Sequence, residues 1–376
     1  WSSFFVIAKA RKNQIPTPFL TRESRHDSQK SSRNRKIFRL SVLLGMGFTF
    51  DNVNNKKGKS SSLAEMDQLI KLNAKNKERI FPFIGGEEVN NEPTAACHRY
   101  AFNLSDLSEE EAERQYPDLF EIARLRVKPQ RESVKRDSYR SNWWRFAEPQ
   151  AALYRTIEPI PRVLATNCGA SPHLGFAFLP KDMIYAHTLT ILAFSKFSPF
   201  AILQSRVHEA WARFFSSSMK DDLRYTPSDC FRTFPFPADF VADSTLESNG
   251  EAYHAFRAQL MIDRNEGLTK TYNRFHARGE NSVDIARLRA LHAEMDAAVL
   301  RAYGWDDLAD RATPEFIEQD ADEGKTPKTR LDWPTEFKDE VLAHLLALNA
   351  ERAAAELAAG LTVPAEEDED LVEVDD

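Results

Sequence analysis

The residues of this chain that are best suited to chemistry lie between Gln204 and Pro237, where bases and hydroxyls follow an amphipathic segment. Val207, Trp211 and Phe214 recur at helical spacing, which predicts a helix with one apolar face. A set of hydrogen-bond donors lies along this helix and just beyond it: Arg206, Arg213, Ser216, Ser217, Ser218 and Lys220. Such groups bind phosphates without distinguishing one base from another. The tract therefore predicts a surface that holds a nucleic-acid backbone.

The sequence contains no complete catalytic motif. Methyl transfer to a base amino group uses an Asn or Asp followed by proline, and neither dipeptide occurs. Gly45-Met46-Gly47 resembles the start of a glycine-rich cofactor loop but lacks the third glycine. Asp118 and Glu121 are not followed by the acid-x-Lys pattern of a metal-dependent nuclease. We expect no catalytic residue, cofactor site or metal site in this chain.

Charge is distributed unevenly along the 376 residues. The net charge of −7 excludes a uniformly basic nucleic-acid binder, yet residues 1–60 carry 13 Lys and Arg against 3 acids. Residues 366–376 carry 8 acids and no base. We expect a disordered basic segment over 1–40 and a disordered acidic tail over 363–376. A basic arm that binds nucleic acid is the alternative for the first of these.

Cysteine spacing and hydropathy indicate where in the cell the protein is expected to be. Cys97, Cys168 and Cys230 stand apart, without the spacing of metal ligands. The longest apolar runs are too short to span a bilayer, and no signal peptide is visible. We expect a cytoplasmic protein with no membrane partner. The first residue is Trp1, so we also expect the chain to be part of a longer protein.

The secondary structure expected around residues 204–237, which we call the donor tract, is mixed and indicates an α+β fold. Residues 41–50 are expected to form a strand, 63–77 a helix and 80–89 a loop. Acids after Ser108 indicate a helix start, and short alternating pieces over 163–192 indicate a β-rich part. Long amphipathic patterns over 251–266, 282–303 and 334–359 indicate helices. We therefore predict a mixed, β-rich domain over 41–240 and a helical C-terminal domain over 241–362.

The segment from Arg114 to Arg162 mixes bases with aromatic residues, and two interpretations of it stay open. It carries 11 bases against 6 acids, interleaved with Tyr139, Trp143 and Trp144. Phosphate contacts with base stacking would use this mixture. A solvated helix face over core aromatics would produce the same pattern.

Six blocks in order resemble a known family. They are LGMGFTFD (44–51), IFPFIGGEEVN (80–90), WWRFAEPQAALY (143–154), HLGFAFLP (173–180), the tract 203–237 and EGLTKTYNRFH (266–276). This series resembles the MmeI-like DNA methyltransferases, which include type IIL restriction-modification enzymes and adenine-specific methylases of phage-defence systems. The resemblance covers about residues 41–359. It implies a target-recognition domain and a helical C-terminal domain, with the methyltransferase domain and its S-adenosylmethionine outside this chain.

The resemblance also implies double-stranded DNA as a partner, together with a methyltransferase domain upstream or in trans. The positions that match the DNA-contacting segment of the family are Arg162, Asn167, Ser171, His173, Arg206, His208, Arg213, Ser216, Ser217, Ser218, Lys220, Arg224 and Tyr225. His173 lies in a loop between expected strands, where short polar side chains can meet base edges. Cys168-Gly169 departs from the basic residue expected before this block, which puts a contact there in doubt.

A second hypothesis is a protein-interaction module without enzymatic activity. In that case the helical domain would dock a partner in a defence complex, the helix stripe from Arg287 to Tyr303 and the acidic tail would matter most, and the basic face would be incidental. An intact methyltransferase would need its missing motifs to be supplied elsewhere.

Overall fold

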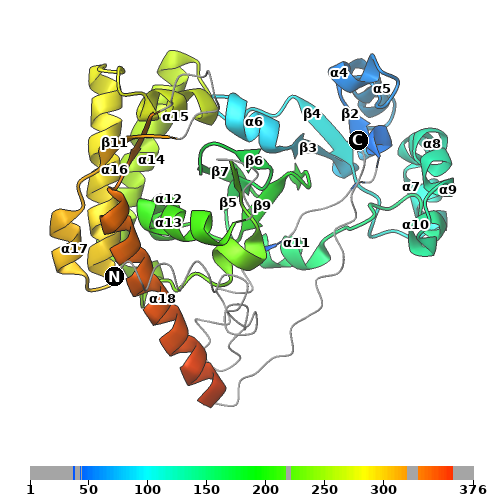
Figure 1. The fold of residues 1–376 in the computed structure, drawn as a ribbon. Coiled ribbons are helices and arrows are strands. Elements are labelled where there is room, and N and C mark those ends of the chain that lie inside the picture. Colours follow the sequence, from blue (N-terminus) through cyan, green and yellow to red (C-terminus); the bar gives the residue numbers. More distant parts are fainter. Residues whose placement is uncertain (1–36, 39–42, 44, 217–221, 320–328, 359–376) are drawn as a thin grey trace.

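The computed structural model describes residues 37–38, 43, 45–216, 222–319 and 329–358. Most of the predicted basic segment, the acidic tail, Ser217, Ser218 and Lys220 lie outside these residues. In Figure 1 a central sheet has the long C-terminal helices on one side and a smaller N-terminal group of helices and strands on the other. Among the described residues, no helix is long and apolar enough to cross a membrane.

The central sheet is antiparallel and has the strand order β1-β9-β5-β7. Its strands are β1 (Ile37–Phe38), β5 (Arg162–Asn167), β7 (Phe176–Pro180) and β9 (Leu189–Leu192). In β5, Val163 to Ala165 are fully buried because the strand lies between β7 and β9 and is covered on both faces. The β-rich part predicted over 163–192 is confirmed.

A second four-stranded sheet organises the N-terminal part, in the order β2-β4-β3-β8. Its strands are β2 (Thr49–Phe50), β3 (Ile80–Ile84), β4 (Arg99–Phe102) and β8 (Ile184–Tyr185). The pairing of β3 with β8 is parallel and joins this part to the segment that follows β7. The helical elements around it are η1 (Met46–Phe48), α4 (Asn52–Asn55), α5 (Leu63–Leu72), η2 (Ala74–Arg79), α6 (Gly86–Asn91), α7 (Glu109–Gln115), α8 (Pro117–Arg126), α9 (Lys128–Glu132), α10 (Asp137–Ser141) and α11 (Ala151–Ile157).

The later part of the chain is mainly helical, with two short antiparallel pairings. The helical elements are α12 (Phe197–Gln204), α13 (Arg206–Phe215), the π-helical turn η3 (Pro227–Phe231), η4 (Phe240–Ala242), α14 (Ser244–Arg264), α15 (Leu268–His276), α16 (Val283–Ala302), α17 (Asp306–Arg311) and α18 (Thr335–Ala358). The pairings are β6 (Ala170–Ser171) with β10 (Leu223–Arg224), and β11 (Glu315–Glu318) with β12 (Thr329–Asp332). The helical C-terminal region is confirmed, whereas α15, α17 and the β11–β12 hairpin were not predicted.

Two hydrophobic clusters form the interior. The smaller one contains residues from Leu43 to Phe146, together with Ile184 and Ala186 of the β8 segment. The larger one runs from Ile84 to Leu345 and is continuous across residue 240. The predicted division into domains at residue 240 stays a prediction, but the apolar core does not separate there.

Two local predictions over residues 41–90 are wrong. The expected strand over 41–50 is limited in the described residues to β2, because Met46–Phe48 form a 3-10 turn after Gly45, whose φ is +115°. The expected loop over 80–89 is strand β3 followed by helix α6. The helix start at Ser108 is confirmed, since its side chain and that of Glu111 form a capping box.

Gly250 allows α12 and α14 to pack closely. A Cβ atom at this position would overlap the carbonyl oxygen of Phe197 and lie 3.2 Å from Cβ of Ala201. We expect Gly250→Ala to destabilise the protein by about 1–3 kcal/mol, because overpacking outweighs the better helix propensity of alanine. Urea denaturation measures the difference. Gly279→Ala is the control, since a Cβ there meets no atom within 4 Å, and equal stabilities for the two variants would contradict the prediction.

Candidate nucleic-acid interface

Helix α13 carries the first part of the donor tract and begins at a capped residue. The hydroxyl of Ser205 accepts from the backbone N–H of His208, which satisfies one free donor of the first turn. Val207 and Trp211 are fully buried, and Nε1 of Trp211 donates to Oγ1 of Thr233 at 3.1 Å. The predicted helix and its apolar face are confirmed.

Arg206 is an internal residue, so its assignment as a DNA contact is wrong. Its side chain is 3% exposed and forms an ion pair of 2.6 Å with Asp296 of α16, which is 0% exposed. Its guanidinium also donates to the carbonyl oxygen of Leu331 at 3.1 Å and contacts Nδ1 of His292 at 3.0 Å. A phosphate could reach this group only if the packing of α13 against α16 and β12 were broken.

His208, Tyr225 and Ser216 are also buried, which corrects their assignment as DNA contacts. Nε2 of His208 lies 3.0 Å from the hydroxyl oxygen of Tyr225, and both side chains are almost completely enclosed. Burial lowers the pKa of His208 to about 3, so its imidazole is neutral. Ser216 ends α13 and is 2% exposed. These three residues stabilise the fold behind the surface.

The guanidinium group of Arg162 contacts partners within the protein. Its guanidinium carbon lies 3.8 Å from the ring centre of Phe178 and 4.3 Å from that of Phe197. Its Nε donates to the carbonyl oxygen of Ser195 at 2.9 Å. Burial lowers its pKa, although Glu247 and Glu251 act against this shift. Arg162 thus joins the central sheet to α12, a role that the sequence pattern did not reveal.

Five of the predicted residues do gather on one face, which we call the recognition face: Asn167, Ser171, His173, Arg213 and Arg224. The pairing of β6 with β10 brings Arg224, which is exposed, opposite Ala170. Gly169 and Pro172, in the same loop, are exposed as well. The loop over residues 167–173 is therefore exposed at Gly169, Ala170 and Pro172, whereas the side chains of Asn167, Ser171 and His173 are half-buried.

Short-range hydrogen bonds hold the shape of this loop. Oδ1 of Asn167 accepts from the backbone N–H of Gly169 at 2.9 Å. The hydroxyl of Ser171 donates to the carbonyl oxygen of His173 at 2.9 Å. Side chains that hydrogen-bond the backbone two residues onward replace regular pairing in turns. The recognition face is consequently built on a defined loop conformation.

Two buried residues that sequence reasoning missed anchor the end of this loop. Gln204 of α12 accepts from the N–H of Phe176 at 3.0 Å and donates to the carbonyl oxygen of Leu174 at 3.1 Å. Arg257 of α14 donates to Oε1 of Gln204 at 3.0 Å and to the carbonyl oxygen of Phe176 at 2.6 Å. These contacts join residues 28 to 81 positions apart, so no local pattern could have indicated them.

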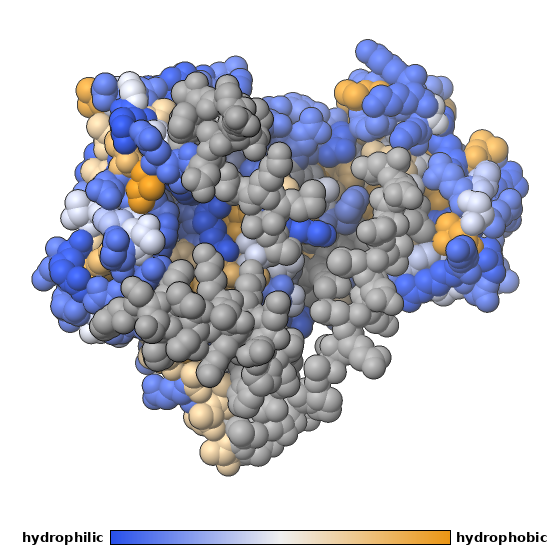
Figure 2. Space-filling model, in the orientation of Figure 1, coloured by the Kyte–Doolittle hydropathy of each residue, from blue (hydrophilic) through white to orange (hydrophobic). Residues whose placement is uncertain are grey.

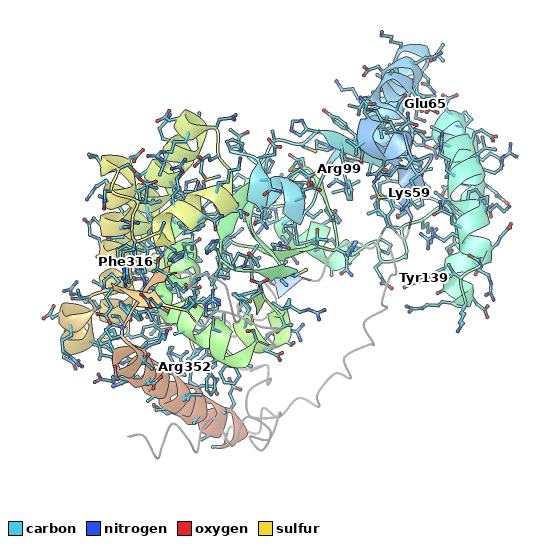
Figure 3. All side chains as sticks on the ribbon, turned by 45° about the horizontal axis from the view of Figure 1, so that its top comes forward. Lys59, Glu65, Arg99, Tyr139, Phe316 and Arg352 are labelled. Atoms are coloured by element: carbon cyan, nitrogen blue, oxygen red, sulfur yellow. The ribbon has the colours of Figure 1, made fainter. Side chains whose placement is uncertain are left out.

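The aromatic-proline strip that follows the donor tract is packed under α18. Phe234 and Phe236 are buried and contact each other with ring centres 4.9 Å apart. Asn349 donates to the carbonyl oxygen of Thr233 and Arg352, labelled in Figure 3, donates to that of Phe236, both at 2.7 Å. The strip is part of the core and not an exposed stacking surface.

Three aromatic residues between Arg114 and Arg162 are also part of the core. Trp143 and Trp144 are buried, and Nε1 of Trp144 donates to the carbonyl oxygen of Leu107 at 3.1 Å. Tyr139, labelled in Figure 3, is buried and donates its hydroxyl hydrogen to Glu148 at 2.6 Å. The stacking interpretation is wrong for these three rings, because none is exposed to a base. The alternative of core aromatics beneath a solvated surface is confirmed for them.

The residues present do not fit S-adenosylmethionine at Gly45-Met46-Gly47. A Cβ atom on Gly47 would lie 2.8 Å from Cγ2 of Val127 and 3.0 Å from the backbone of Arg126. Gly47 therefore lets η1 pack against α8 instead of opening a cradle for a ligand.

Comparisons with known proteins agree with this architecture. Residues 49–238 match the family model described as "MmeI, target recognition domain", which is half of the chain. The chain belongs to this family, and the resemblance drawn from its sequence blocks is confirmed. A solved structure of the type IIL restriction-modification enzyme MmeI in complex with DNA has a similar fold, with a TM-score of 0.55 and 15% identity. That match covers 85% of this chain and 36% of the solved chain.

A curated relative adds a weaker similarity in sequence. DNA methyltransferase A of Bacillus subtilis (strain 168) is 25% identical over 162 residues. The aligned part is 43% of this chain and 17% of the relative. This chain therefore spans a minor part of the length of both proteins.

Proposed function

We propose that this chain reads duplex DNA on behalf of a methyltransferase that modifies adenine at N6 in a restriction-modification or phage-defence system. The observation that carries this proposal is the match to the MmeI target recognition domain over residues 49–238. The catalytic domain, with its S-adenosylmethionine, would lie upstream or in trans in the cytoplasm. This chain would supply the contacts that select the site, while another domain performs the chemistry.

The recognition face supports this proposal because it combines a cation with a polar loop. Arg224 is suited to a phosphate, and the loop over 167–173 offers side chains of the kinds that hydrogen-bond base edges. Arg213 lies beside the loop and donates to the carbonyl oxygen of Pro172. Lys220, Ser217 and Ser218 lie outside the described residues, so their DNA contacts stay predictions.

Binding of the full chain to duplex DNA tests the function. A fluorescence-anisotropy titration against duplexes selected from a randomised pool should give a preferred sequence whose affinity exceeds that of unrelated duplexes at physiological salt. Weak binding that is equal for all sequences and fully reversed by salt would contradict site recognition. Methylation of adenine in the selected site, measured with the complete enzyme, tests the assignment of the reaction.

Arg224 provides a sharper test of the surface. If it neutralises one phosphate, Arg224→Ala should weaken binding to all sequences and reduce the slope of log K against log salt by about one. Arg301→Ala is the matched control, because Arg301 is 50% exposed on α16 and pairs with Asp310. A salt slope that Arg224→Ala leaves at the wild-type value would remove Arg224 from the interface.

The interaction-module hypothesis loses one of its two supports, the helix stripe, while the acidic tail lies outside the described residues. Leu288, Leu291 and Met295, from the stripe that would have docked a partner, are buried in the larger hydrophobic cluster. Where residues are described, the face seen in Figure 2 is largely hydrophilic, with apolar residues only in separate spots. We therefore favour DNA recognition over protein docking as the function of this chain.

A further inference from the structure

Two arginines from distant parts of the chain hold the loop of the recognition face. The carbonyl oxygen of Pro172 accepts from Nη2 of Arg213 at 2.9 Å and from Nη1 of Arg330 at 3.0 Å. Arg213 belongs to α13, whereas Arg330 belongs to β12 and is 158 residues from Pro172. Charge-assisted hydrogen bonds are stronger than neutral ones, so this loop is restrained by the C-terminal hairpin as well as by α13.

Glu209 fixes both arginines. Its Oε1 accepts from Arg213 at 2.9 Å and also forms an ion pair with Arg330. Burial alone would raise the pKa of Glu209, but Arg330 and Arg213 hold it well below its ordinary value. The carboxylate is therefore charged, and it orients the two guanidinium groups toward the loop.

Helix α15 makes a separate contact with the same loop. Nε2 of His173 donates to Oδ1 of Asn273 at 2.8 Å, since an amide oxygen can only accept. The imidazole of His173 also stacks on that of His276, with ring centres 5.0 Å apart and an interplanar angle of 16°. Asn273 itself is exposed. Its side chain thus sets the ring orientation of His173 from outside the core.

We propose that Asn273 and Arg330 are positioning residues, which set the base preference of the recognition face through His173 and Pro172 and not by contacting DNA. This inference rests on the proposed function. Phosphate contacts supply most of the salt-dependent affinity, whereas base preference depends on side chains placed within hydrogen-bond distance of base edges. The loss of Asn273 or Arg330 would therefore change the preference of the protein at one base pair more than its general affinity for DNA. The C-terminal part of the chain, which supplies Asn273 and Arg330, would then be a component of the DNA-recognition site.

Asn273→Ala in the full chain is the main test, because the residue is exposed and its loss leaves no buried charge. We expect the ratio of affinities for two bases at one position to change by about fivefold or more, with the salt slope unchanged. Amide hydrogen exchange over residues 169–174 should be faster than in the wild type without DNA. Asn249→Ala is the matched control, since that side chain donates to the carbonyl oxygen of Thr245 within its own helix.

Asn273→Asp separates positioning from a direct contact. A carboxylate still accepts from His173, so this variant should restore the wild-type base ratio, whereas a base contact through the amide would not tolerate it. Arg330→Lys is a second variant, and it should alter the same position because lysine lacks the planar fork that reaches Pro172 and Glu209 together. If the wild type discriminates between duplexes and Asn273→Ala discriminates identically, or weakens all duplexes equally, the inference is overturned. If the wild type itself shows no preference, the proposed function fails and the inference fails with it.

Discussion

Replacing Arg206 by alanine is expected to destabilise the protein by about 3–5 kcal/mol, because the change removes the guanidinium that balances the buried charge of Asp296. Asp296 is 0% exposed, and both of its carboxylate oxygens accept from Arg206, one from the backbone N–H at 2.9 Å and one from the guanidinium at 2.6 Å. The loss concerns folding, so DNA binding should fall only as far as the folded fraction falls. Urea denaturation at pH 7.5, combined with binding measured on the remaining folded protein, distinguishes the two effects.

The exposed pair of Arg287 and Glu294 provides the control. Its side chains are 51% and 52% exposed, so Arg287→Ala should cost less than about 1 kcal/mol. The double variant Arg206→Met with Asp296→Leu should recover part of the lost stability, since apolar residues can replace a buried ion pair. A stable Arg206→Ala protein with weakened DNA binding would return Arg206 to the interface and contradict its structural assignment.

Arg206 also shows why local patterns identify a helix more reliably than they identify its exposed face. The spacing of Val207, Trp211 and Phe214 correctly predicts α13. It predicts a polar opposite face as well, yet His208 and Ala212 are buried in addition to the apolar stripe. His208 lies against the rings of Tyr225 and Phe234. Arg206 is covered by Asp296 of α16 and Leu331 of β12, which are 90 and 125 residues away in the chain. Tertiary packing of that kind leaves no periodic signal in the helix itself.

The loop of the recognition face can be predicted from local sequence, whereas the residues that hold it in place cannot. The short polar residues, Gly169 and Pro172 that interrupt strand-like segments predict a loop here, and the structure has an irregular segment with Gly169 and Pro172 exposed. Asn167 and Ser171, which the family resemblance indicates, lie half-buried beside His173 in the same segment. The buried residues that anchor this loop, Gln204 and Arg257, cannot be predicted from such a pattern. Each anchor bonds to backbone groups 28 to 81 residues away, and a buried glutamine or arginine in a helix has no distinguishing neighbours in sequence.

The strand expected over 41–50 failed for a backbone reason. Apolar and β-branched residues there favour a strand, but Gly45 has a positive φ and turns the chain before Met46. Gly47 then packs against Val127 and Arg126, a contact that requires the absence of a side chain. Glycine in an apolar run thus marked a close approach between elements, which cannot be told from a strand interruption by sequence alone.

Acidification is expected to produce the second large effect, through histidines that are neutral inside the fold. Burial lowers the pKa of His173 to about 4 and the pKa values of His208 and His254 to about 3. Burial also lowers the pKa of His276. In the unfolded chain a histidine binds a proton near pH 6.5. Between pH 6.5 and about 4 the unfolded state therefore binds more protons, and stability falls as the pH falls.

Each of these groups contributes up to about 1.4 kcal/mol per pH unit in that window, and the contribution is fully present only above about pH 6.5. The free energy of unfolding should accordingly decrease by several times this amount between pH 6.5 and 5. The carboxylates of Glu209 and Asp296 do not explain such a loss, because their lowered pKa values place their effect at more acidic pH. Urea denaturation at a series of pH values gives the slope directly.

His254→Phe isolates one histidine from this total. The ring of His254 lies among those of Phe178, Phe197 and Phe200, with centres 5.2 to 5.5 Å apart, so an apolar ring suits the site. Its removal takes one titrating group from the unfolded state, and the slope between pH 6 and 5 should decrease by up to about 1.4 kcal/mol per pH unit. A slope equal to that of the wild type would mean that His254 is charged in the folded protein. In that case its contacts with the three rings would be cation–π interactions and its pKa would not be lowered by burial.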